Sequence, residues 1–227
     1  MNTGAYGVIF DMDGVLVDSY QAHYESWLQT ARRWGLEMTE PQFRATFGRT
    51  SRDIIARLWG ANFTDEQIAE FDQLKEQAYR DGLVHHFPQM PGADELIADL
   101  HAEGFRLAVG SSGPKENVRT VLRLLPHGRL IDATVSGGEV RHGKPDPEVF
   151  VRAAQKIGVP PAFCAVIEDA VVGVEAARRA GMAALAVTGT ASARELAPRA
   201  HQVVESLAEL TPRLVRSIID AARGVQE

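Results

Sequence analysis

The chain has 227 residues and a mass of 24.8 kDa, which suits one compact domain or one domain carrying a small insertion. Hydrophobic residues make up 45% and charged residues 24% of the sequence, values that argue against disorder and fibrous repeats. A net charge of −6 argues against general nucleic-acid binding, the lone Cys164 excludes a disulfide framework, and no apolar run approaches the roughly 18 residues that cross a bilayer. We therefore expect a soluble, cytoplasmic monomer or small homo-oligomer without nucleic-acid or membrane partners.

The first predicted element is a short buried strand, Val8-Ile9-Phe10. Residues 16–88 then contain helical signals and no convincing strand. An apolar stripe around residues 27–34 closes at Gly35, and Thr64 opens a capping box before a second apolar face. We interpret residues 16–88 as a helical cap domain inserted into a discontinuous core formed by residues 1–15 and 89–227.

The second half of the chain alternates strands with helices. Apolar runs at residues 107–109, 165–167 and 184–187 predict buried strands, and helical spacing follows Pro114 and Asp146-Pro147 and recurs over residues 174–180. A last surface helix is expected over residues 207–222. Fully apolar strands separated by helices are typical of a parallel sheet covered on both faces, so we predict a doubly wound α/β core.

Two pairs of acidic residues follow predicted strands: Asp11 and Asp13 follow the first strand, and Glu168 and Asp169 follow the strand over residues 165–167. Because ligands of open parallel sheets bind beyond the carboxyl ends of the strands, we expect both pairs at one site. Four carboxylates together require protons or a cation, and oxygen ligands suit Mg²⁺ better than zinc or copper. Taken singly, each aspartate could instead cap a strand end or a turn.

Two further segments supply groups that bind phosphate. Gly110-Ser111-Ser112-Gly113 lies at a predicted strand-to-helix turn, where hydroxyl and backbone N–H groups can hold phosphate oxygens. Lys144 precedes Pro145 and would supply the fixed cation that the acidic pocket lacks. The alternatives are an ordinary serine- and glycine-containing loop and a solvated lysine.

Together these segments resemble, in order and spacing, the four motifs of the haloacid dehalogenase superfamily. The resemblance covers nearly the whole chain, and the segments at residues 143–147 and 167–177 are similar to its phosphatase and β-phosphoglucomutase-like branch. That branch combines a Rossmann-like α/β core with a helical cap between the first and second motifs, which matches the inserted block.

The resemblance implies a role for each matching residue. Asp11 would be the nucleophile that forms an aspartyl-phosphate, and Asp13 would be the general acid and base. Mg²⁺ would be held by Asp11, the main-chain carbonyl of Asp13 and Asp169, with Glu168 bound directly or through water. The transferring phosphoryl group would be held by Ser111, with Ser112 beside it, and by Lys144.

Some cap positions also resemble this branch. His23 matches a histidine that lies near the site and helps to position the aspartate at Asp13, and the segment Arg49-Thr50-Ser51-Arg52 matches a cap loop whose arginine binds a second phosphate. The alternatives are a helix histidine without a role and a surface helix start at Arg52.

One departure concerns the mutase pattern, which has a lysine–asparagine pair soon after the serine loop. Here that place reads Gly113-Pro114, with Lys115 and Asn117 displaced along the helix. We therefore expect a Mg²⁺-dependent phosphatase acting on a small phosphorylated metabolite, a sugar phosphate or a phosphoglycolate-like compound. The alternatives are a β-phosphoglucomutase-type enzyme and a non-catalytic phosphoacceptor or binding module, which would need neither the cap nor Asp13.

Overall fold

The computed structural model describes residues 5–46 and 49–224. The chain forms two compact units, one of Met1–Asp18 with Pro88–Glu227 and one of Ser19–Phe87. We call the first the α/β unit and the second the helical unit. Within the described ranges, none of the helices has the length and apolar character needed to span a membrane.

Among the described residues, six parallel strands form one sheet in the α/β unit, in the order β3-β2-β1-β4-β5-β6. The strands are β1 (Gly7–Phe10), β2 (Arg106–Gly110), β3 (Ala133–Val135), β4 (Cys164–Glu168), β5 (Ala183–Val187) and β6 (Gln202–Val204). The chain builds outward from β1 to β3 on one side and then from β4 to β6 on the other. The order therefore reverses between β1 and β4, the point where parallel sheets place ligands.

The four inner strands agree with the predicted ones, whereas the edge strands β3 and β6 were not predicted. Each edge strand has three residues and pairs with one neighbour. Such short segments show no readable periodicity, because only pairing with the next strand defines them. By contrast, every residue of β1, β4 and β5 is buried, which explains their continuous apolar sequence.

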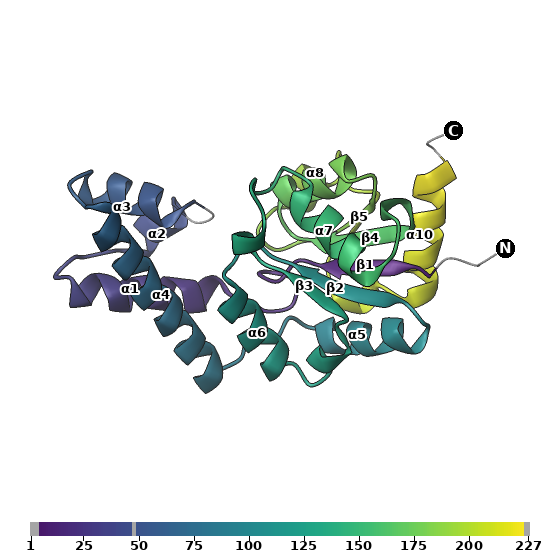
Figure 1. Ribbon diagram of the computed structural model, residues 1–227, viewed down its shortest axis with the longest axis horizontal. Helices are drawn as coiled ribbons and strands as arrows, with labels where there is room; N and C mark the ends of the chain where they lie inside the picture. Colours follow the sequence, from purple (N-terminus) through teal and green to yellow (C-terminus); the bar gives the residue numbers. More distant parts are fainter. Residues whose placement is uncertain (1–4, 47–48, 225–227) are drawn as a thin grey trace. The chain divides into compact units, whose positions relative to one another are not determined.

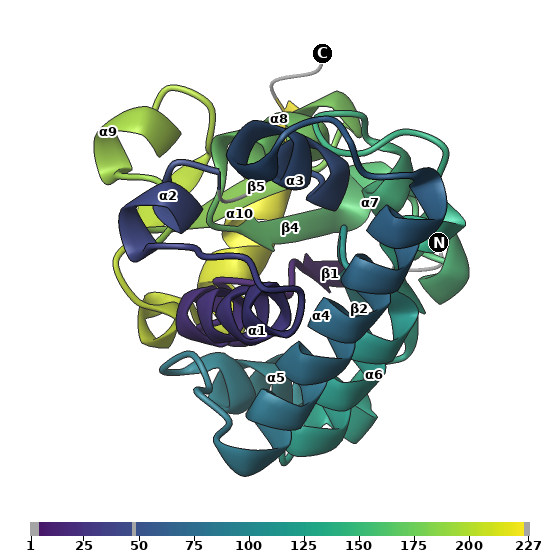
Figure 2. The ribbon, with the colours of Figure 1, turned by 90° about the vertical axis from the view of Figure 1, so that its left-hand side faces the viewer.

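Helices cover both faces of the sheet. They are α5 (Ala93–Ala102), α6 (Lys115–Leu124), α7 (Glu148–Ile157), α8 (Val171–Arg179), α9 (Ala193–Leu196) and α10 (Pro212–Gly224), with short 3-10 turns η1 (Gly128–Leu130), η2 (Gly137–Glu139), η3 (Pro161–Phe163) and η4 (Leu207–Glu209). Helices α7 and α8 pack on one face and α5 and α10 on the other (Figures 1 and 2).

The predicted helix over residues 207–222 is in fact two elements, η4 and α10. Thr211 accepts a hydrogen bond from the backbone of Leu214 at 3.2 Å, and Pro212 opens α10. Proline lacks the N–H group that a helix interior requires, so the chain restarts its helix there.

The helical unit contains α1 (Tyr20–Arg33), α2 (Glu40–Arg44), α3 (Ser51–Trp59) and α4 (Asp65–His85). Helices α1 and α4 pack against each other (Figure 1), and Trp27 of α1 lies 5.2 Å from Phe71 of α4 between ring centroids. Thr64 forms the capping box expected at the start of α4, and Gly35, with a φ of 68°, follows the end of α1.

Candidate active site

The acidic residues gather where β1 and β4 end. The backbone N–H of Asp11 donates to the carbonyl of Ile167 at 2.9 Å, which ties the two strand ends together. Asp11, Glu168 and Asp169 are all buried, and each offers a carboxylate oxygen within 4.8 Å of the others. The structure therefore brings together three of the predicted metal ligands, with Asp13 two residues beyond Asp11 in the turn that follows β1.

Lys144 lies inside this acidic cluster. Its Nζ donates to Asp11 Oδ1 at 2.5 Å and to Glu168 Oε1 at 2.6 Å, and its side chain is 7% exposed. The ammonium also lies 4.7 Å from the ring centroid of Phe150 in α7, close enough for a cation–π interaction. Lys144 thus lies among the acidic residues where the sequence predicts a fixed cation, and its contact with Phe150 has no signal in the sequence.

Burial and mutual repulsion shift the charges of this cluster. Burial raises the pKa of Asp11 well above its ordinary value, attraction to Lys144 opposes the shift, and repulsion from the other carboxylates adds to it. Burial and the charge of Glu168 raise the pKa of Asp169 to about 6. Burial disfavours the charged form of Lys144, yet Asp11 and Glu168 outweigh it and raise the Lys144 pKa. One ammonium among several buried carboxylates leaves an excess of negative charge, which a further cation would stabilise.

Two glycines make room for these carboxylates. Gly14 has a φ of 77°, and a Cβ built there would lie 1.9 Å from Asp169 Oδ2. A Cβ at Gly173 in α8 would lie 1.7 Å from Glu168 Oε1. Both glycines lie next to residues used for the resemblance. Only the folded chain shows that Gly14 packs against Asp169, a member of the other acidic pair, and that Gly173 packs against Glu168 at the end of β4.

Backbone hydrogen bonds fix the second acidic pair. Glu168 Oε2 accepts the backbone N–H groups of Asp169 and Ala170, each at 2.9 Å, while its other oxygen accepts from Lys144. Asp169 Oδ2 accepts the backbone N–H of Thr190 at 3.3 Å. Glu168 therefore holds Lys144 in addition to its predicted role at the metal.

The loop that carries Lys144 is closed by Glu148 at the start of α7. Glu148 Oε2 accepts the backbone N–H groups of Arg141 at 2.7 Å and His142 at 3.2 Å, so the chain folds back on itself around Lys144. Arg179 at the end of α8 donates to the carbonyl of Pro145 at 3.2 Å. Glu148 lies within reach of His142 and Asp146 in a grouping of metal-ligand type, but hydrogen bonds from the loop and from Arg152 already use its oxygens.

The serine loop follows β2 at the same edge of the sheet. Ser111 is buried, its N–H donates to the carbonyl of Val135 at 3.0 Å, and its Oγ accepts the N–H of Gly113 at 3.0 Å. Ser112 is exposed. A Cβ built at Gly113 would lie 4.0 Å from Asp13 Oδ2, so the loop faces the second aspartate.

The predicted cap residues lie in the helical unit. The His23 ring stacks on Tyr79 of α4 at 4.1 Å between centroids, and the Ser51 hydroxyl donates to the carboxylate of Asp72. Arg49 is exposed, and its backbone N–H donates to the carbonyl of Thr46 at 3.1 Å.

Arg52 pairs with Asp65 at 2.7 Å, with side-chain exposures of 58% and 80%. Arg52 is also the second residue of α3, which is the surface helix start of the alternative interpretation. Such an exposed pair leaves the guanidinium accessible to a competing anion.

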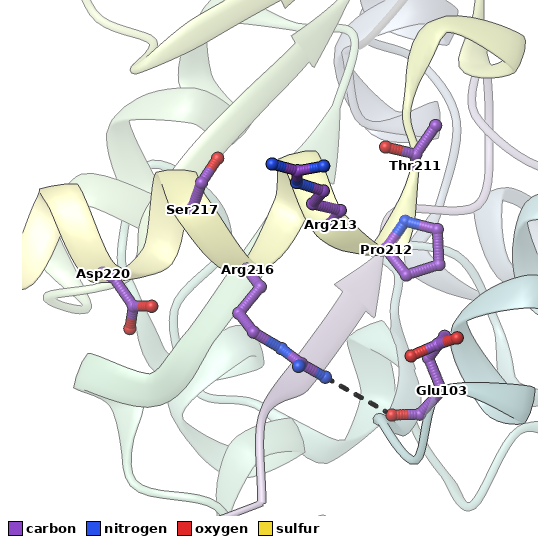
Figure 3. A pocket seen from close by; sticks show the side chains of 7 residues that line it. All are labelled: Glu103, Thr211, Pro212, Arg213, Arg216, Ser217 and Asp220. Atoms are coloured by element: carbon purple, nitrogen blue, oxygen red, sulfur yellow. Dashed lines mark hydrogen bonds between the residues drawn. The ribbon is translucent and has the colours of Figure 1, made fainter.

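A separate concavity of about 390 Å³ lies along α10, beside Glu103, which precedes β2 (Figure 3). Arg216 donates to the carbonyl of Glu103 at 3.5 Å and lies 5.2 Å from the Tyr6 ring centroid. Figure 3 shows Arg213 pointing to the side of α10 opposite to Arg216. This hollow lies at the amino ends of the strands, so its size does not make it the site of the chemistry, and we attribute it to the packing of α10.

The chain is similar to several known proteins. The family model for haloacid dehalogenase-like hydrolases matches residues 7–181. The chain belongs to this family. A phosphorylated carbohydrates phosphatase of Thermotoga maritima is 30% identical to the chain over 175 residues, which cover 77% of this chain and 81% of that protein. A β-phosphoglucomutase of Bacillus subtilis is 31% identical over 188 residues, covering 79% and 82% respectively.

The fold of this hydrolase is also found in solved structures. A crystal structure of β-phosphoglucomutase from Clostridium difficile superposes with a TM-score of 0.81 at 24% identity, covering 96% of this chain and 98% of that one. The α/β core with an inserted helical unit is therefore shared with that protein.

Proposed function

We propose that this hydrolase is a Mg²⁺-dependent phosphatase that cleaves the phosphoric monoester of a small phosphorylated metabolite through an aspartyl-phosphate on Asp11. The observation that carries the proposal is the contact of Lys144 with both Asp11 and Glu168 inside a buried carboxylate cluster. Such a cluster is compatible with a phosphate dianion only if cations offset its charge.

The residues of the cluster suit Mg²⁺. Asp11, Glu168 and Asp169 offer oxygen atoms alone, which a hard divalent cation prefers. Burial raises the pKa values of Asp11 and Asp169, and repulsion from the neighbouring carboxylates adds to both shifts. We propose that Asp11 and Asp169 hold the ion with the main-chain carbonyl of Asp13, and that Glu168 binds directly or through water. When bound, the ion would neutralise charge on the phosphoryl oxygens.

The reaction proceeds in two displacements. A carboxylate oxygen of Asp11 attacks phosphorus, the bond from phosphorus to the ester oxygen breaks, and Asp13 gives its proton to the departing alcohol. Asp13 then takes a proton from water, whose oxygen attacks phosphorus and releases inorganic phosphate together with the Asp11 carboxylate. The Ser111 and Ser112 loop and Lys144 hold the equatorial oxygens in both steps.

The segment after the serine loop favours hydrolysis over a mutase reaction. A mutase must grip a second, non-transferring phosphate. Here Pro114 precedes α6 and has no N–H to donate, and Asn117 is 1% exposed within the unit. The likeness to a β-phosphoglucomutase nevertheless makes sugar-phosphate isomerisation the second candidate.

The substrate class follows from the relatives by analogy. Because one relative is named for phosphorylated carbohydrates and another for phosphoglucose, we propose a sugar phosphate or a compound of similar size. His23, Arg49, Ser51 and Arg52 are the proposed cap contacts. If Arg49, Ser51 and Arg52 act in selection, their alanine variants should raise KM for a preferred substrate while leaving hydrolysis of p-nitrophenyl phosphate unchanged. If His23 positions Asp13, its alanine variant should lower hydrolysis of p-nitrophenyl phosphate as well.

The test is Asp11→Asn, with Asp94→Asn as the control. Both aspartates are 7% exposed in the α/β unit, but Asp94 pairs with His127 rather than with Lys144. We expect D11N to abolish hydrolysis of p-nitrophenyl phosphate while the protein stays folded, and D94N to keep it. Chelation of divalent cations should abolish hydrolysis by the wild type, and added Mg²⁺ should restore it.

Other outcomes assign other functions. Normal turnover by D11N would refute the mechanism. Isomerised hexose phosphate without free phosphate, from β-glucose 1-phosphate and a trace of bisphosphate, would indicate the mutase. Stable phosphorylation of Asp11 without turnover on a broad panel of phosphorylated metabolites would indicate a phosphoacceptor module.

A further inference from the structure

A short turn beside the serine loop is held by one glutamate and one lysine. Glu139, the last residue of η2, accepts hydrogen bonds through Oε1 from the N–H of Ser136 at 3.1 Å and from its hydroxyl at 3.0 Å. Its Oε2 accepts from Lys156 Nζ at 2.5 Å, and the same ammonium donates to the carbonyl of Thr134 in β3 at 2.7 Å. Both ends of this carboxylate are therefore fixed, one to the turn and one to α7.

The turn supports the serine loop directly. The N–H of Gly137 donates to the carbonyl of Gly113 at 2.9 Å, and two residues earlier on each segment the N–H of Ser111 donates to the carbonyl of Val135. A Cβ built at Gly137 would lie 2.1 Å from the carbonyl oxygen of Ser112. The backbone of residues 135–137 thus runs against the backbone of residues 111–113, with no side chain between them.

A displacement of the turn would therefore move the loop. Gly113 is hydrogen bonded to Ser111 Oγ on one side and to Gly137 on the other, and its Cα faces Asp13. Because the hydrogen bonds that join the turn to the loop, from Gly137 to Gly113 and from Ser111 to Val135, link backbone atoms, the position of the loop depends on the conformation of the turn.

We propose that Glu139 and Lys156 are positioning residues for the phosphoryl group, acting through the 136–139 turn on the Ser111–Gly113 loop. This inference rests on the proposed function, because the loop is taken as the holder of the phosphoryl oxygens. Neither residue touches the substrate in this scheme. Their effect is to keep the loop at the distance from Asp11 and Asp13 that the reaction needs.

The pair is suited to this role over the pH range of an assay. The hydrogen bond from Lys156 lowers the pKa of Glu139 to about 2, with burial opposing the shift and Ser136 adding to it. The side chains of Lys156 and Glu139 are 43% and 32% exposed, and ion pairs at such positions contribute little to stability. Removing one charge should therefore loosen the turn without unfolding the protein.

The chain contains a matched control. The 3-10 turn η4 has the same architecture as η2, a serine N-cap at Ser206 and a capping glutamate at Glu209. Glu209 accepts the N–H of Ser206 at 2.8 Å, and its turn packs beside Gly92 at the start of α5. A purely structural role for capping glutamates would make both positions behave alike.

The experiment compares Glu139→Gln, Lys156→Met and Glu209→Gln in the full chain. In E139Q the amide oxygen can still accept from Ser136, but the amide nitrogen cannot accept from Lys156. We expect E139Q and K156M to lower kcat/KM for p-nitrophenyl phosphate about tenfold and to weaken binding of orthovanadate similarly. An error of about 1 Å in such a site reduces the rate about 100-fold, and loosening the turn should displace the loop by less than that. E209Q should stay within about twofold of the wild type.

Amide hydrogen exchange provides a readout that is independent of activity. Exchange in peptides covering residues 111–113 and 136–139 should become faster in E139Q and K156M and stay unchanged in E209Q. Unchanged exchange and kinetics, or equal losses in E209Q, would overturn the inference. If E139Q does not fold, K156M decides the outcome, because it leaves the Glu139 cap on Ser136 in place.

Different results would refute the proposed phosphatase function and the positioning role of Glu139 and Lys156. A wild-type protein that hydrolyses no phosphomonoester would refute the proposed function. An active wild type whose E139Q and K156M variants match E209Q would refute only the positioning role.

Discussion

The sharpest consequence of the site geometry concerns Gly14. Its φ of 77° is unfavourable for any other residue, and a Cβ there would lie 1.9 Å from Asp169 Oδ2. In Gly14→Ala, restoring an ordinary contact requires Asp169 or the turn after β1 to shift by more than about 1 Å. A shift of that size in a reacting site costs about 100-fold in rate, or about 2.7 kcal/mol of transition-state stabilisation.

Gly104 provides the matched control for this substitution. Its φ is also 77°, but nothing lies within 4 Å of a Cβ built there. Alanine at either position should therefore lower the free energy of unfolding by about 1–2 kcal/mol through backbone strain. Only G14A should lose about 100-fold or more in kcat/KM for p-nitrophenyl phosphate, and its affinity for Mg²⁺ should fall. If G14A and G104A had kcat/KM values within about threefold of each other, the close approach of Gly14 to Asp169 would not matter for the chemistry.

Two further predictions concern charge. Lys144→Met leaves two buried carboxylates without their cation, so urea denaturation with chelator at pH 7 should show that the free energy of unfolding falls by about 3–5 kcal/mol. The control Lys115→Met, at an exposed position, should change the free energy of unfolding by less than about 0.5 kcal/mol. Equal effects would mean that Lys144 is not paired as described. Glu139 has a pKa lowered to about 2 from 4.5, so it stabilises the folded state above pH 4.5 and this contribution is lost as the pH falls towards 2. Because the pair is partly exposed, the wild type should exceed E139Q by only about 1 kcal/mol at pH 6, and the two unfolding free energies should converge near pH 2.

Local signals in the sequence were sufficient for much of the fold. The inner strands are apolar throughout because both faces of the sheet are covered, and this leaves an unmistakable run of residues such as Val8-Ile9-Phe10. The capping box at Thr64 depends on four consecutive residues and was equally readable. Edge strands β3 and β6 were missed because pairing with a neighbour, not their own composition, defines them.

The candidate site shows the same division. The acidic pairs were predicted because strand ends of a parallel sheet meet at one edge, a rule that needs only the order of elements, and Lys144 was predicted as the fixed cation that such an acidic pocket lacks. Three contacts of Lys144 could not be predicted, because each joins residues that are not neighbours in the chain. Its ammonium donates to both Asp11 and Glu168 and lies over the ring of Phe150.

The sequence by itself determined which chemical groups this protein has and at which ends of its strands they lie, because residue type and periodicity are local properties. The tertiary structure alone decided which carboxylates Lys144 and Lys156 contact, which glycines pack directly against a carboxylate, and which turn supports the serine loop. Those features depend on distances between segments separated by tens of residues, and such distances are set only when the sheet assembles.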